Sequence, residues 1–158
     1  MAENWYNWQN EVDVLVDARG RDAMKPITFI DAEIEPNCGT IRDMGSIKGD
    51  GSSFHSGSLA DFIKFLDGSQ YIGGHNIFKH DLQYIQNDLD AAGLNHVQYI
   101  DTLYLSPLLF PAKPYHALLK DDKLQSEDTN NPLNDAKKAR DLFFDEVTAF
   151  HKTDEGLK

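Results

Sequence analysis

The stretch FIDAEIE, residues 29–35, constrains the fold more than any other part of the sequence. Read with a period of two, its isoleucines and its alanine fall on one side and its acids on the other. The acids are Asp31, Glu33 and Glu35. This alternation predicts a β-strand over residues 27–35 with one face on the core. The other face carries a row of carboxylates, whose mutual repulsion disfavours joint ionisation.

Strand and helix patterns alternate along the rest of the chain. Strands are predicted at 27–35, 40–48, 52–56, 70–74 and 97–102, and helices at 58–66, 80–93, 115–122 and 132–152. Ser58 and Asp101 are the expected N-caps of the segments that follow them, and Pro132 stands in the first turn of the last helix. The proline-rich stretch 106–114 is expected to be irregular. The order β-β-β-α-β-α-β-α predicts an α/β domain in which helices pack on a mixed sheet.

The length and composition fit one globular domain. We expect an N-terminal extension of unknown role at 1–24, a domain at 25–152 and a short tail at 153–158. Cys38 is the only cysteine, which excludes an internal disulfide and a cysteine-built zinc site and suits a reducing cytoplasm. No apolar run approaches the ~20 residues that cross a bilayer, so no membrane partner is expected.

The charge balance limits the classes of function. The chain has 26 acids and 15 bases, a net charge of −11. This argues against nucleic-acid binding by general phosphate neutralisation, which needs a basic face. It permits an enzyme whose carboxylates collect metal ions.

Two further acids stand near the expected helix starts. Asp81 follows GHNIFKH, and Asp135 lies in NNPLNDAKKARD. Each acid alone has an ordinary explanation: a D-x-E strand is usually a solvated sheet face, and an aspartate in a first helical turn complements the helix dipole. The combination of all these acids in one chain is the informative feature.

In this order, FIDAEIE, GGHNIFKHDLQYI and NNPLNDAKKARDLF resemble the three motifs of the DEDD superfamily of 3′–5′ exonucleases. The resemblance covers roughly residues 27–150 and includes the linking segment IDTLYLSPLLFPAKPYHALLK. More narrowly, the chain resembles the exonuclease-like domain at the N-terminus of certain bacterial RecQ-type helicases. The resemblance implies a ribonuclease H-like mixed sheet with FIDAEIE as its central strand.

The resemblance also implies a chemistry. Asp31, Glu33, Asp81 and Asp135 would bind two Mg²⁺ or Mn²⁺ ions that assist hydrolysis of phosphodiester bonds. His75 and Asn76 match the second motif, where such residues shape the strand-to-helix turn and contact nucleic acid. The implied partners are single-stranded or 3′-ended nucleic acid, with DNA favoured over RNA, and a helicase domain in the same polypeptide.

The expected general base is missing from its usual place. Active members carry a histidine five residues, or a tyrosine four residues, before the last aspartate, where this chain has Asn130 and Asn131. Neither amide is a base at neutral pH, although Asn130 can position a water molecule. His80 is expected to point away from the acids, and His116 is expected to be structural.

Two hypotheses therefore stay open. The first is an exonuclease of weak activity, whose water is activated mainly by metal. The alternative is a catalytically weak or inactive module of a helicase that binds nucleic-acid ends or a partner.

Overall fold

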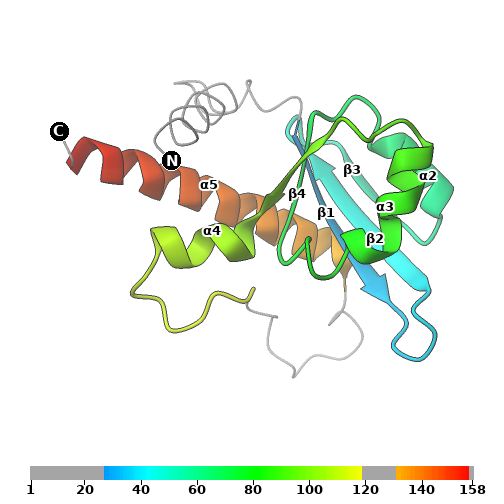
Figure 1. Ribbon diagram of the computed structural model, residues 1–158, viewed down its shortest axis with the longest axis horizontal. Coiled ribbons are helices and arrows are strands. Elements are labelled where there is room, and N and C mark those ends of the chain that lie inside the picture. The colour runs from blue at the N-terminus through cyan, green and yellow to red at the C-terminus, as the bar shows by residue number, and fades with distance from the viewer. Residues whose placement is uncertain (1–26, 119–130, 157–158) are drawn as a thin grey trace.

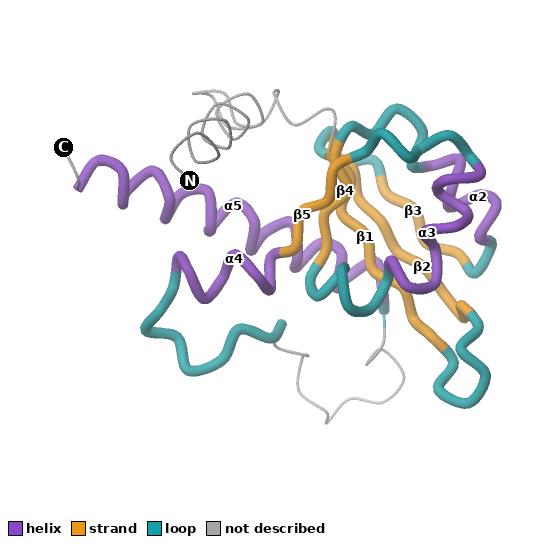
Figure 2. Tube along the Cα trace, viewed as in Figure 1, coloured by secondary structure: helices purple, strands orange, loops and turns teal. Residues whose placement is uncertain are grey.

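The computed structural model describes residues 27–118 and 131–156, and the expected extension at 1–24 lies outside them. The five strands form one sheet in the order β3-β2-β1-β4-β5, as Figures 1 and 2 show. Their bounds are β1 Ile27–Ile34, β2 Ile41–Lys48, β3 Ser53–Ser56, β4 Tyr71–Gly74 and β5 Gln98–Asp101. β2 is antiparallel to both of its neighbours, whereas β1, β4 and β5 are mutually parallel. FIDAEIE is thus in the central strand, as predicted.

The helices cover both faces of this sheet (Figure 1). Their bounds are α2 Leu59–Phe65, α3 Leu82–Ala91, α4 Thr102–Leu109 and α5 Pro132–Gly156. Ile30 and Ala32 face one core, which they share with α2 and α3. Ile27 and Phe29 face the other, which they share with α5. The predicted fold class, an α/β domain with a mixed sheet flanked by helices, is confirmed, and the arrangement is compatible with a ribonuclease H-like fold.

The burial of β1 refines the simple alternation seen in the sequence. Ile27 to Ile30 are all buried, because α5 covers the face that carries Ile27 and Phe29. The same face continues with Asp31 and Glu33, which are only partly buried. The acids therefore begin where the helical cover of this face ends.

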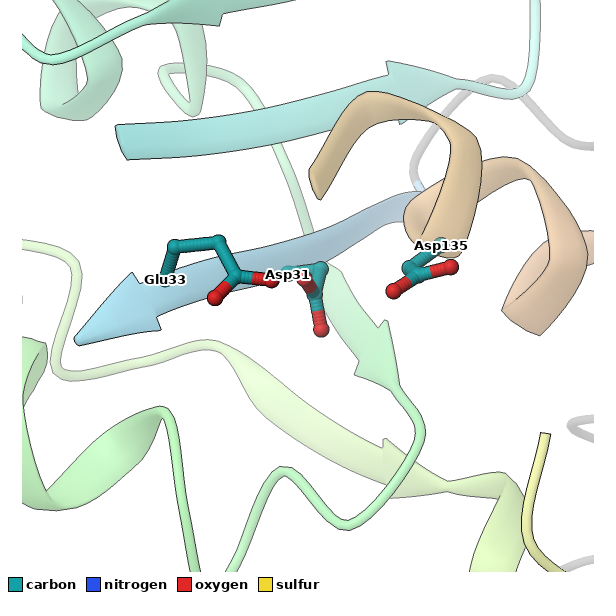
Figure 3. A group of neighbouring side chains, drawn as sticks. All are labelled: Asp31, Glu33 and Asp135. Carbon is teal, nitrogen blue, oxygen red and sulfur yellow. The ribbon is translucent and has the colours of Figure 1, made fainter. Parts of the chain in front are cut away.

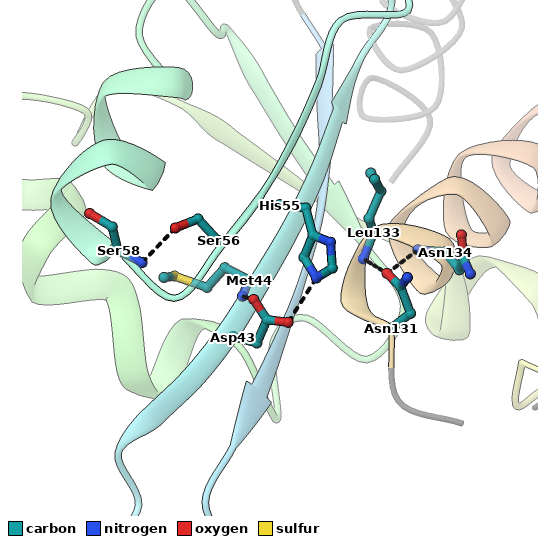
Figure 4. Close-up of polar contacts among 8 residues, drawn as sticks. All are labelled: Asp43, Met44, His55, Ser56, Ser58, Asn131, Leu133 and Asn134. Atoms are coloured by element: carbon teal, nitrogen blue, oxygen red, sulfur yellow. Dashed lines mark hydrogen bonds and ion pairs between the residues drawn. The ribbon is translucent and has the colours of Figure 1, made fainter. Parts of the chain in front are cut away.

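The start of α5 rests directly on β2. Gly45 pairs with Asp31 across the sheet, and a Cβ atom at Gly45 would overlap the backbone of Pro132 and Leu133. Asn131 closes this end of the helix, because its Oδ1 accepts hydrogen bonds from the N–H groups of Leu133 (3.0 Å) and Asn134 (3.3 Å). Figure 4 shows this cap beside the sheet. A glycine in mid-strand thus fixes where α5 begins, since only a bare backbone admits such close contact.

The helix ends agree with the sequence in some places and differ in others. The Ser58 side chain caps α2 as predicted, and Asp101 caps α4 by accepting from the Leu103 N–H. The prediction that 106–114 is irregular is wrong up to Leu109, because α4 continues through Pro107. Pro107 lacks the N–H that would donate to the Leu103 carbonyl, so α4 continues through this residue without that hydrogen bond.

The expected helix at 115–122 is absent from the part that the structure describes, residues 115–118. At the C-terminal end, α5 continues past residue 152 to Gly156. None of the described helices combines the length and apolar character that a membrane crossing requires.

Glu146 on α5 is a buried acid. Its residue is 1% exposed, and neither carboxyl oxygen has a hydrogen-bond partner among the residues that the structure describes. Burial raises its pKa from 4.5 to about 8, with smaller contributions from Asp101 and Asp145 and an opposing one from Lys113. The proton on Glu146 is therefore retained at neutral pH in the folded state and lost in the unfolded state.

We expect Glu146→Gln to change how stability depends on pH. Because the folded-state pKa is raised, the wild-type free energy of unfolding falls by ~1.4 kcal/mol per pH unit between pH 4.5 and about 8. Glutamine does not titrate, so the free energy of unfolding of the variant does not fall in this way. Its excess over the wild-type value should grow to the order of a few kcal/mol at pH 8 and then stay constant. Urea unfolding across this range measures it, with Asp88→Asn as the control, because Asp88 is an exposed acid on α3 that does not contribute to the pKa of Glu146. Parallel curves for Glu146→Gln and wild type would contradict the expectation.

Candidate metal centre

Three carboxylates from two distant parts of the chain meet beside the central strand. Oxygen atoms of Asp31, Glu33 and Asp135 all lie within 4.8 Å of one another, and Figure 3 shows them grouped between β1 and the start of α5. Asp31 and Glu33 share a strand face because they are two residues apart. Asp135 reaches them because it lies in the first turn of a helix seated on Gly45. Such a group could hold a metal ion, since hard cations prefer carboxylate oxygens.

The protonation of Asp31 reflects this crowding. Burial, and to a smaller extent the neighbouring charges of Asp81, Asp135 and Glu33, together raise its pKa from 3.8 to about 8, against the effect of His80. This shift agrees with the mutual repulsion expected of a row of carboxylates. Asp31 carries a proton at neutral pH, which a bound cation would displace.

The fourth predicted acid, Asp81, lies next to Asp31 but outside this group of three. Its residue is 1% exposed, and its Oδ1 accepts a hydrogen bond from the Ala32 N–H (2.7 Å). The pairing of β1 with β4 ends at Phe29 and Gly73, so Asp81 supplies an acceptor to β1 beyond that ladder. Burial raises the pKa of Asp81, while His80 and the Ala32 N–H oppose the shift. Asp81 thus ties the start of α3 to the central strand.

His80 also lies at the site, and the expectation that it points away is wrong. Its Nδ1 is 3.8 Å from Asp81 Oδ2. The contact with the Asp81 carboxylate raises the pKa of His80, against desolvation, and the charges of Asp31 and Glu33 raise it as well. His80 lies in the turn before α3, so the helical geometry used for the prediction does not apply to it.

A tight turn after β4 presents Asp81. Asp101, at the neighbouring end of β5, accepts hydrogen bonds from the N–H groups of Asn76 (2.8 Å) and Phe78 (3.2 Å). Asn76 has φ = 67°, a left-handed conformation that asparagine tolerates better than most residues. The predicted cap Asp101 therefore has a second role that the sequence analysis missed. The signal for this second role was the position of Asp101 at the carboxyl end of β5, the strand that pairs with β4.

Among the remaining predicted residues, two histidines form side-chain hydrogen bonds, and the roles of the others are not tested by the structure. His75 is half-buried, its Nδ1 is hydrogen-bonded to Thr102 Oγ1 (2.8 Å), and desolvation lowers its pKa. The Nδ1 of His116 is hydrogen-bonded to Ser106 Oγ (2.8 Å), which agrees with the structural role expected for this histidine. Contact of His75 and Asn76 with nucleic acid stays a prediction, and Asn130 lies outside the described residues.

One polar pair near the acids was not anticipated. Asp43 on β2 pairs in register with Glu33, so their side chains share a face of the sheet. Asp43 Oδ2 is 2.7 Å from His55 Nε2 on β3 (Figure 4). Once the strand register is known, the sequence places Asp43 beside Glu33, but the register comes from the folded sheet.

Comparison with known proteins adds no family assignment: no protein-family model matches the chain, and a search of curated proteins finds no match.

Proposed function

We propose that this protein is a metal-dependent 3′–5′ exonuclease that hydrolyses phosphodiester bonds at nucleic-acid 3′ ends. One observation carries the proposal: three carboxylates from β1 and α5 lie within 4.8 Å of one another. Crowding of partly buried acids costs free energy in a metal-free protein, and a cation removes that cost. Burial and neighbouring acids hold the pKa of Asp31 at about 8, as this view requires.

The proposed ions are two Mg²⁺ or Mn²⁺, which in such sites stabilise both the attacking and the leaving oxygen. Asp31 lies between Glu33 and Asp135 (Figure 3) and would be the central ligand of the group. Glu33 and Asp135 would supply further carboxylate ligands. Asp81, which interacts electrostatically with Asp31, would contribute a fourth carboxylate.

In the reaction, a water oxygen attacks the terminal phosphorus and the bond to the 3′ oxygen of the preceding nucleotide breaks. The water loses a proton and the leaving 3′ oxygen gains one, so the products are a nucleotide and a shortened strand. Asn130 stands where a base is usual and would position the water. Activity is therefore expected to be low for this class of enzyme.

The proposed substrate is a single-stranded or 3′-ended nucleic acid in the cytoplasm, with DNA favoured over RNA. A helicase domain in the same polypeptide is the further proposed partner. The second candidate function is a binding module without useful catalysis. The side chain of Asn131 favours it, because Oδ1 is already engaged as the helix cap and Asn131 therefore does not replace the base.

A cleavage assay separates the two candidates. A 5′-labelled single-stranded oligonucleotide is incubated with the protein and Mg²⁺, Mn²⁺ or EDTA. The exonuclease predicts a ladder that shortens from the 3′ end with metal only, and no ladder when the 3′ end is blocked. No metal-dependent product with either ion would end the exonuclease proposal and leave the binding module.

A further inference from the structure

Exposed aromatic rings gather on the turn that carries Asp81. Phe78 is 46% exposed and Tyr104, on α4, is 49% exposed. Their ring centroids are 5.8 Å apart with an interplanar angle of 76°, so the two rings meet edge to face. Leu108, one turn further along α4, is 70% exposed. Large apolar side chains usually avoid such exposure when they lie together, and a contiguous patch marks an interaction surface.

A positive charge accompanies the rings. The Lys79 Nζ lies 5.8 Å from the centroid of the Tyr104 ring. The chain has a net charge of −11, and Lys79 gives this patch a positive charge of its own. Exposed aromatic faces with an adjacent lysine are the combination that holds single-stranded nucleic acid, because bases stack on the rings and the lysine meets a phosphate.

The patch is fixed in position relative to the acids. The Phe78 N–H donates to Asp101, which holds the turn, and the same turn ends at Asp81 beside Asp31. A strand whose terminal phosphate reaches the acids must leave over a neighbouring surface, and this turn is such a surface.

We infer that Phe78, Tyr104 and Lys79 form a stacking platform for the bases of a single strand next to its 3′ terminal phosphodiester. The inference takes its occupant from the proposed function but concerns binding alone. Stacking needs unpaired bases, so the platform selects single strands over duplexes of the same length.

Binding is measured by fluorescence anisotropy with a labelled oligonucleotide in EDTA, where no metal-dependent cleavage occurs. Phe78→Ala together with Tyr104→Ala should weaken binding roughly 10- to 100-fold. This is the range expected when one or two bases can no longer stack on an aromatic side chain of the protein. Phe78→Leu with Tyr104→Leu keeps apolar bulk and should lose nearly as much. Lys79→Ala should reduce the salt dependence of binding by about one counterion.

The control for exposed aromatics is Tyr115→Ala, because Tyr115 is 80% exposed and lies outside the patch. It should bind as the wild type does. An abasic oligonucleotide retains the phosphates without the bases, so the wild type should bind it as weakly as the double alanine variant binds the normal one.

Two results would overturn the platform: unchanged oligonucleotide binding in both double variants, or equal wild-type affinity for the abasic and normal strands. A patch that serves a protein partner predicts the first of these. The outcome is separate from that of the cleavage assay, since binding through the rings can be present without turnover, and turnover without binding through the rings.

Discussion

Asp31→Asn is expected to abolish metal-dependent cleavage and, at the same time, to stabilise the metal-free protein. Loss of a central ligand should lower the rate by at least roughly 10²-fold, the effect of removing one preorganised group that stabilises transition-state charge. The stabilisation has a different origin. The folded-state pKa of Asp31 is raised from 3.8 to about 8, so wild-type stability falls as pH rises through this window and is constant above it. Asparagine does not titrate, so at pH 7 the metal-free Asp31→Asn protein should have a free energy of unfolding on the order of a few kcal/mol higher than that of the wild type.

Thermal unfolding with EDTA and with Mn²⁺ measures the second effect beside the cleavage assay. Metal should stabilise the wild type, by about 2.7 kcal/mol at a concentration 100 times the dissociation constant, and should leave Asp31→Asn unchanged. Glu35→Gln is the matched control, because it removes the next acid along the same sequence stretch but lies outside the group of three. If Asp31→Asn were less stable than the wild type in EDTA, the carboxylates would not be in conflict, and the argument for a cation would lose its basis.

The sequence predicts the strand that contains FIDAEIE, and the face that carries its acids, because both follow from local periodicity. Asp31 and Glu33 share a face in any strand that contains them. The sheet order adds that β1 lies between an antiparallel and a parallel neighbour, a position inferred from the family resemblance and now observed. Periodicity alone would not have distinguished a central strand from an edge strand.

The relation of Asp81 to the other acids was not predictable in detail. Its buried position depends on β4 ending its pairing at Gly73, which leaves the Ala32 N–H available as a donor. That length is a property of two strands far apart in the sequence. The position of His80 beside Asp81 was missed for a related reason, because His80 belongs to the turn before α3 and not to the helix.

The continuation of α4 through Pro107 shows a different limit. Proline disfavours a helix interior because its N–H is missing, and this led to the prediction of an irregular segment. In the structure, Asp101 caps the start of α4, and Ser106, the residue before Pro107, is buried. Capping and tertiary packing together outweigh the local preference, and the segment is too short for its periodicity to show this.

Gly45→Ala is expected to be the most damaging single substitution at the site, although it removes no acid. The added Cβ would overlap the backbone of Pro132 and Leu133, and backbone atoms cannot move aside as the end of a flexible side chain can. The start of α5 must therefore lift from the sheet. We expect a loss of stability on the order of 3 kcal/mol or more, at or above the upper end of typical overpacking costs. Asp135 would move away from Asp31 with the helix, and Mn²⁺ affinity should fall with it.

Gly51→Ala separates this steric effect from the general cost of replacing glycine. Gly51 has φ = 91° and open space around its Cβ position, so its substitution should cost only the ~1–2 kcal/mol of a left-handed backbone and should leave the metal centre intact. Urea unfolding gives the stabilities of both variants, and calorimetric titration gives their Mn²⁺ affinities. A Gly45→Ala protein that binds Mn²⁺ as the wild type does would show that the contact between α5 and β2 does not position Asp135. Loss of affinity in Gly45→Ala alone would show that a residue without a side chain sets the spacing of the acids, because it determines how closely α5 approaches the sheet.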